Sequence, residues 1–290
     1  MIDPLALAAF SLAGFLAATA ATMMGFGIGT SLTPIFALVY RTQIAVMLVA
    51  IVHFLSNAFR LALFRRHVDF GLVRRFGILS IVGALIGSLS QGLIDSDWLK
   101  VALGVLLILL GGIELLPGGS GWHFPRRLDQ LGGLISGLLG GFLGNQGAVR
   151  GAYLANYDIL KESFIATAAL SAVFIDSTRI PVYLYSQWPE VVGNWPVLLA
   201  TAASAYLGTL LGQRLVGRVS QAAFKRWVNG MIFAFGVVMV GQGSWQATVS
   251  VGAAAAATLL APALVLSLIT LQRRLARRED RDRHGNRVSR

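Results

Sequence analysis

Long apolar stretches separated by short polar joints dominate the chain. A helix that spans a bilayer needs about 20 apolar residues, and most of these stretches reach that length. We expect them to be helical, because a backbone in lipid must satisfy its own hydrogen bonds. The stretches occupy residues 4–40, 43–64, 71–93, 98–116, 131–157, 162–185, 194–216, 222–243 and 246–271.

Glycine clusters interrupt two of these stretches. Residues 4–40 are too long for one spanning helix, and both they and residues 131–157 contain closely spaced glycines. Glycine weakens a helix interior and permits left-handed backbone. One interpretation is close helix packing through small residues. The other, which we favour because the breaks recur at matching places, is a pair of broken helices or re-entrant hairpins. The glycines are Gly25, Gly27 and Gly29 in the first stretch, and Gly140, Gly141, Gly144, Gly147 and Gly151 in the second.

The chain contains a weak internal repeat, in which residues 14–112 resemble residues 133–238. In each copy a glycine-broken segment precedes a helix that carries a polar pair. Internal symmetry of this kind is typical of transporters. The pairs are Asn57 with Arg60 and Asp176 with Arg179, and 35 positions separate Gly25 from Arg60 and Gly144 from Arg179.

Composition and charge fix the class and the orientation. Apolar residues make up 56% of the chain and charged residues 13%, against about 25% charged residues in soluble domains. The net charge of +11 comes from basic residues in the joints and the tail, which is the pattern that orients membrane proteins. We therefore expect no nucleic-acid partner. Applied to the joints, the positive-inside rule predicts that the two halves are inverted, with a periplasmic N-terminus and a cytoplasmic C-terminus.

These patterns predict an all-α integral membrane protein. Its two inverted repeats would each contain a Gly-broken re-entrant hairpin plus three spanning helices, followed by one extra C-terminal helix. The Arg-rich tail would lie near anionic lipid. The predicted boundaries are 1–116 for the first repeat, 117–130 for a cytoplasmic linker, 131–243 for the second repeat, 244–272 for the additional helix and 273–290 for the basic tail.

Charged side chains inside the apolar stretches are the main candidates for function. Each costs about 2.5–3.5 kcal/mol at the bilayer centre on insertion scales. Arg150 follows the second glycine cluster, where it could meet an anion together with free backbone N–H groups. The alternative is that Arg150 pairs with Asp158. Asn145 and Gln146 are uncharged donors suited to the oxygens of an oxyanion.

Four further polar residues leave a structural interpretation open beside a functional one. Asp176 and Arg179 are three apart and share a helix face, so they form either an ion pair or a site in which Arg179 binds an anion and Asp176 a proton. His53 is either a packing residue or a proton relay. Arg60 lies close to Arg65 and can extend to the inner membrane interface.

The candidate set follows from these arguments. We expect substrate binding at Arg150, Asn145, Gln146, Gly147, Gly25, Gly27, Gly29, Arg179 and Asn57, and proton coupling at His53 and Asp176. The chain has no Cys, its four His are scattered, and no catalytic constellation is recognisable. We therefore expect neither an enzyme nor a cofactor nor a metal site.

Three segments carry a family resemblance: GFLAATAATMMGFGIGTSLTPIFALV, GFLGNQGAVRGAYLANY and KESFIATAALSAVFIDSTRIPVYLY. Over about residues 5–243 the chain resembles the TauE/SafE sulfite exporter family, also called the toluene-sulfonate uptake permeases. The resemblance implies a bacterial inner-membrane protein with two repeats that moves sulfite, sulfonates, or other organosulfur and carboxylate anions. The first motif of the family tends to run GxGGG, whereas this chain has GFGIG.

The sequence therefore predicts a secondary transporter that moves a small anion by alternating access. The alternatives are a passive anion channel and a membrane subunit or enzyme of a larger complex. The expected partners are the small anionic substrate and the lipid bilayer, and pairing as a homodimer is left open.

Overall fold

The computed structural model describes residues 4–37, 39–91, 101, 104, 105, 107–109, 112, 128–144 and 146–246. Within these residues every regular element is helical, which confirms the all-α class. The elements are α1 (Pro4–Met24), α2 (Ile28–Phe36), α3 (Thr42–Phe64), η1 (Arg65–His67), α4 (Phe70–Leu72), η2 (Val73–Gly77), α5 (Ile78–Leu89), α7 (Asp129–Leu143), α8 (Gln146–Ala155), α9 (Lys161–Gly193), α10 (Trp195–Val216) and α11 (Gln221–Gln246).

Six helical segments in the described part of the chain are long and apolar enough to cross a membrane. Five of them match predicted spans, and the sixth is α1, which we had expected to be one arm of a hairpin. The predicted span 98–116 is described only in part, and 246–271 lies outside the described residues. The six segments are Pro4–Met24, Gln43–His67, Phe70–Leu89, Lys161–Tyr185, Trp195–Val216 and Gln221–Gly241.

Both predicted glycine breaks are present. The first separates α1 from α2, with φ of 82° at Gly25 and 123° at Gly27. The second separates α7 from α8, with φ of 75° at Gly144. Side chains other than glycine rarely adopt such angles. At 1.5 Å per residue, the 9 residues of α2 and the 10 of α8 extend only about 15 Å, half the hydrocarbon thickness.

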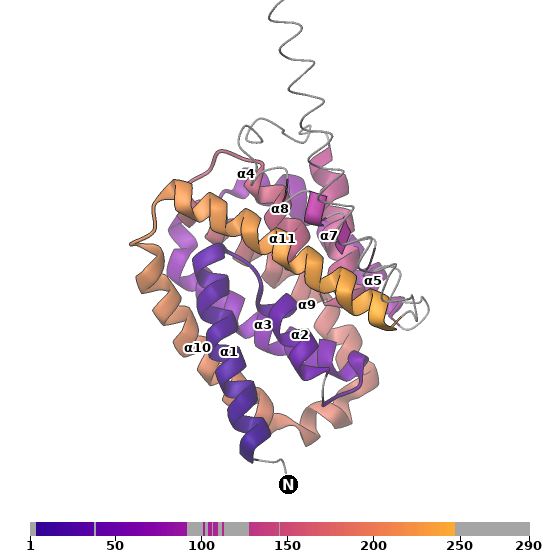
Figure 1. Cartoon of the computed structure of the whole chain (residues 1–290). Coiled ribbons are helices and arrows are strands. Elements are labelled where there is room, and N and C mark those ends of the chain that lie inside the picture. Colours follow the sequence, from indigo (N-terminus) through magenta and orange to yellow (C-terminus); the bar gives the residue numbers. More distant parts are fainter. Residues whose placement is uncertain are drawn as a thin grey trace, which may run out of the picture. The chain divides into compact units, whose positions relative to one another are not determined.

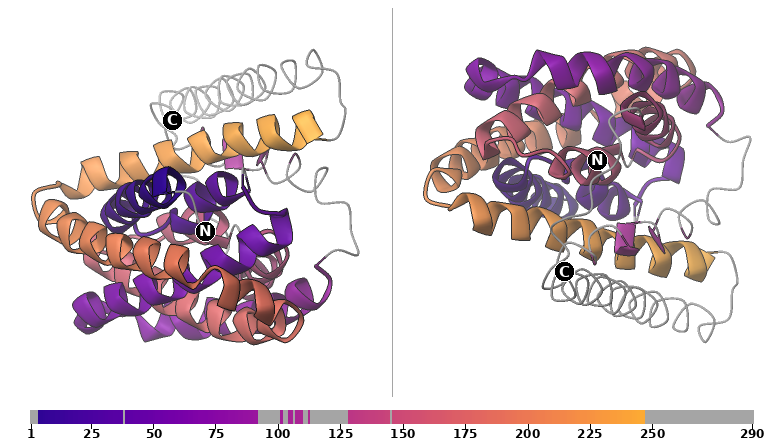
Figure 2. Two further views of the ribbon diagram at one scale, coloured as in Figure 1. Left: turned by 90° about the horizontal axis from the view of Figure 1, so that it is seen from below. Right: turned by 90° about the horizontal axis from the view of Figure 1, so that it is seen from above.

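The helices around the breaks pack in a reciprocal pattern. Helix α1 lies along α10, and α5 lies along α7, while α3 contacts α9 and α2 contacts α8 (Figures 1 and 2). The two long pairings are close because glycine faces backbone. A Cβ built on Gly83 of α5 would lie 2.2 Å from the Leu134 carbonyl oxygen of α7, and one on Gly208 of α10 would lie 2.2 Å from the Phe15 carbonyl oxygen of α1.

Two compact units emerge from the contacts. Unit 1 comprises Met1–Ser96 and His123–Val228, and unit 2 comprises Asp97–Trp122 and Asn229–Arg290. Unit 1 draws on both predicted repeats and holds both glycine breaks. In unit 2, Gly104 and Gly236 meet backbone to backbone, since a Cβ on either would lie 2.7 Å from the carbonyl oxygen of the other.

Candidate functional site

The two glycine breaks meet inside unit 1. A Cβ added to Gly29 would lie 2.8 Å from the Gly144 carbonyl oxygen, and one added to Gly147 would lie 3.4 Å from the Gly27 nitrogen. The two segments therefore approach so closely that a side chain has little or no room between them. Gly25 lies apart from this contact and packs against the ring of Phe164 on α9.

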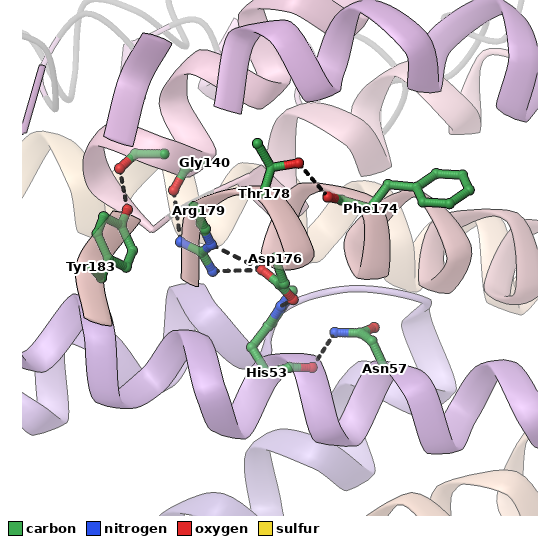
Figure 3. Close-up of polar contacts among 9 residues, drawn as sticks. His53, Asn57, Gly140, Phe174, Asp176, Thr178, Arg179 and Tyr183 are labelled. Atoms are coloured by element: carbon green, nitrogen blue, oxygen red, sulfur yellow. Dashed lines mark hydrogen bonds and ion pairs between the residues drawn. The ribbon is translucent and has the colours of Figure 1, made fainter. Parts of the chain in front are cut away.

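A buried chain of charged groups lies beside the breaks and joins α3 to α9 (Figure 3). His53 Nδ1 lies 2.6 Å from Asp176 Oδ2, and Asp176 Oδ1 lies 2.9 Å from both Nε and Nη2 of Arg179. The side chains are 0–3% exposed. The ion pair expected within α9 is therefore present, and it extends to His53, 123 positions away.

The same helix α9 satisfies the end of α7. Arg179 Nη1 donates a hydrogen bond of 2.7 Å to the Gly140 carbonyl oxygen, and the Tyr183 hydroxyl donates to the Gly141 carbonyl oxygen (Figure 3). The last carbonyls of a helix lack intrahelical donors and carry partial negative charge, so a cation is favourable there. The Gly140 carbonyl oxygen therefore accepts both the N–H of Gly144, at 3.0 Å, and the guanidinium of Arg179, which holds Arg179 at the end of α7 beside the break.

Arg60 occupies the corresponding position on α3, and it is 1% exposed. Its Nη1 donates to Asn57 Oδ1 at 3.1 Å and its Nε to Thr22 Oγ1 at 3.2 Å, while Asn57 Nδ2 donates to the His53 carbonyl oxygen at 2.8 Å. Arg60 therefore does not extend to a membrane interface, as its sequence position allowed, but lies inside the helix bundle.

Arg150 completes the set from α8. It is fully buried, and it is close enough for its charge to act on Asp176, Arg179 and Arg60. Asp158, the partner proposed as an alternative, has a side chain that is 87% exposed and pairs with Lys225 at 2.6 Å. We call Arg60, Arg150, Arg179, Asp176 and His53 the cationic cluster.

Several hydroxyl groups beside the cluster or on the helix after the first break were not among the predicted site residues. The Thr22 hydroxyl accepts a hydrogen bond from Arg60, and the Tyr183 hydroxyl donates to the Gly141 carbonyl oxygen, next to the Gly140 acceptor of Arg179. Thr30 and Thr33 on α2 are buried, and their hydroxyls make no hydrogen bond within the described part of the chain. A threonine hydroxyl in a helix usually bonds to a carbonyl of its own helix, as that of Thr22 does to Ala18. A threonine in the sequence therefore does not by itself indicate a binding site. The position of Thr30 and Thr33 directly after the first glycine break was the only available sign.

Not every predicted site residue can be placed. Asn145 lies outside the described residues, and the side chain of Gln146 is likewise outside them. Within the described residues, no three His, Cys, Asp or Glu side chains are grouped so that they could hold a metal ion.

These features define a multi-pass membrane protein with charged groups buried between its helices. The family model for the sulfite exporter TauE/SafE matches residues 10–239, which include both glycine breaks and the whole cationic cluster. The chain belongs to the TauE/SafE sulfite exporter family, which is a family of membrane transporters and not of enzymes. No curated protein and no solved structure gives a significant match.

Proposed function

We propose that the protein is a secondary transporter that moves sulfite, sulfonates or related small oxyanions across the bacterial inner membrane by alternating access. The observation that carries this proposal is the cationic cluster beside two touching helix breaks. Family membership points to the same class of substrate.

The charge of the cluster favours an anionic ligand. The cluster contains three guanidinium groups and one carboxylate, so with a neutral His53 it carries two more positive than negative charges. Buried charges are costly unless they are paired. A bound oxyanion lowers this cost because it brings negative charge and acceptors for N–H groups.

The helix breaks supply further donors. Helices α2 and α8 begin at Ile28 and Gln146, immediately after the breaks. The first N–H groups of a helix lack intrahelical acceptors and carry partial positive charge. Together with the Thr30 and Thr33 hydroxyls, they offer several donors to the oxygens of one small anion, as the broken helices of other transporters do.

The reciprocal packing supports the inverted repeat on which alternating access would depend. Helices α1, α2, α3 and α5 correspond in order to α7, α8, α9 and α10. The first helix of each set packs on the fourth helix of the other, and α2 meets α8 as α3 meets α9. An arrangement of this kind is expected of two like modules related by a twofold axis in the membrane plane.

The membrane potential determines in which direction the anion can move without a coupled ion. An inside-negative potential of 100 mV favours the exit of a monovalent anion by about 2.3 kcal/mol. Export can therefore proceed as uniport. Uptake would need a coupled ion, for which the His53–Asp176 pair is the candidate proton site.

Flux into proteoliposomes tests the proposed function. We expect saturable, electrogenic flux of sulfite or of a sulfonate such as methanesulfonate in the wild type, and a loss of at least about tenfold in Arg150→Ala, because a buried charge that binds substrate is removed. Arg41→Ala is the matched control, since Arg41 is exposed and its loss changes the net charge equally. Wild-type flux in Arg150→Ala would remove Arg150 from the site. Flux that does not saturate would indicate a channel, and absence of any anion flux would overturn the proposal.

A further inference from the structure

The two polar pairs of the repeat differ in a single chemical group. Asn57 and Arg60 on α3 occupy the positions that Asp176 and Arg179 hold on α9. In each pair the two residues are three apart, and the arginine lies 35 positions after the first glycine of its break, Gly25 or Gly144. All four side chains are buried, with exposures of 0–1%. In both pairs the first residue accepts a hydrogen bond from the arginine, at 3.1 Å in the first and 2.9 Å in the second.

This difference leaves the two arginines in unlike electrostatic states. The Asp176 carboxylate neutralises Arg179, whose remaining nitrogen Nη1 is held by the Gly140 carbonyl oxygen. Among the described residues, Arg60 bonds only to the neutral groups Asn57 and Thr22, through Nη1 and Nε. Its Nη2 is buried and makes no hydrogen bond within the residues that the structure describes.

A buried guanidinium with a neutral environment needs negative charge from elsewhere. Arg150, another member of the cationic cluster, is also positive and repels Arg60. We propose that Arg60 is the residue that takes the charge of the substrate anion, through its Nη2, and that Asn57 is a positioning residue that holds Arg60 without neutralising it. This inference rests on the proposed function and names the arginine that confers selectivity for anions. Arg179 is in contrast a structural cation that fixes the end of α7.

The amide of Asn57 gives a near-isosteric test. Asn57→Asp keeps the shape and the acceptor for Arg60 but adds the carboxylate that Asp176 already provides in the other repeat. Asn57→Ala removes both side-chain hydrogen bonds of Asn57, the one to the His53 carbonyl oxygen and the one from Arg60, and adds no charge, so it is the matched control. The Kd for sulfite would be measured by isothermal titration calorimetry on the purified full-length protein, with flux in proteoliposomes as the second readout.

We expect Asn57→Asp to weaken sulfite binding by at least about tenfold, and Asn57→Ala to weaken it distinctly less. Equal losses in the two variants, or sulfite binding by Asn57→Asp within about twofold of the wild type, would overturn the inference. Should Asn57→Asp not fold, Arg60→Lys and Arg60→Gln decide the question. Loss of binding in Arg60→Gln with retention in Arg60→Lys supports the role of Arg60, and wild-type binding in Arg60→Gln overturns it.

The wild-type titration separates this inference from the proposed function. If the wild type neither binds nor transports sulfite or methanesulfonate, the proposed function fails, and this inference with it. If the wild type binds sulfite and Arg150→Ala loses binding while Asn57→Asp retains it, only the role of Arg60 fails.

Discussion

At the scale of single residues, Asp176 is the centre of the buried polar network. Its two carboxylate oxygens bind groups on different helices, His53 on α3 and Arg179 on α9. Arg179 in turn holds the end of α7 through Gly140. Removal of this one carboxylate would therefore leave a buried guanidinium without its counter-charge, which is a more severe defect than removal of the whole ion pair.

We predict that Asp176→Asn lowers the free energy of unfolding by about 3 kcal/mol, measured by denaturation with sodium dodecyl sulfate in mixed micelles. The double variant Asp176→Leu with Arg179→Met should lose distinctly less, because it removes the Arg179 guanidinium together with its counter-charge. A double variant that is as unstable as Asp176→Asn would show that the ion pair is not the source of the effect.

The sequence predicted the members of the cluster better than their partners. Local spacing is enough to pair Asp176 with Arg179, because residues three apart share a helix face. It could not pair His53 with Asp176, since that contact depends on how α3 and α9 pack. The short distance from Arg60 to Arg65 left extension to the interface open, and a hydrogen bond to Thr22 on α1, together with burial, places Arg60 inside the bundle. The equivalence of Asn57 and Asp176 was visible in the sequence. Only the burial of Arg60 shows that the amide of Asn57 leaves this guanidinium without a counter-charge among the described residues.

At the scale of elements, glycine determines both where the helices break and how closely they pack. The breaks were predictable because clustered glycines are rare inside stable helices. The packing partners were not, since nothing in the GALIG segment of α5 indicates that it packs on α7 of the other repeat. Helix α1 ends at the predicted break, where the backbone turns at Gly25 and Gly27, although hydropathy continues through these residues.

Alanine substitution tests the glycine contacts between helices. We predict that Gly83→Ala and Gly208→Ala each lower the melting temperature in detergent by several degrees, because a Cβ at either position would lie 2.2 Å from a backbone oxygen and the helices must separate to admit it. The control is Gly193→Ala, since no atom lies within 4 Å of a Cβ at that position. Unchanged melting temperatures for Gly83→Ala and Gly208→Ala would contradict the proposed close packing.

At the scale of the whole molecule, the proposed transport mechanism depends on two similar modules that cross the membrane in opposite directions. The described helices pack reciprocally, as such modules would, and the beginning of α1 lies at the opposite end of unit 1 from α4 (Figure 1). The charge pattern predicts the orientation of each module in the membrane, because the basic residues after α3 and after α10 should both be cytoplasmic. These two joints occupy non-equivalent places in the repeats, so their location on one side requires inversion.

Cysteine accessibility is the most direct test of this central claim, because the chain contains no Cys. Single variants Arg66→Cys, Arg218→Cys and Glu190→Cys introduce thiols at exposed positions. An impermeant maleimide would be applied to right-side-out and inside-out membrane vesicles. We predict that Arg66→Cys and Arg218→Cys react only from the cytoplasmic face, and Glu190→Cys only from the opposite face. Reaction of Arg66→Cys and Arg218→Cys from opposite faces would contradict the inverted topology and the substrate site built on it.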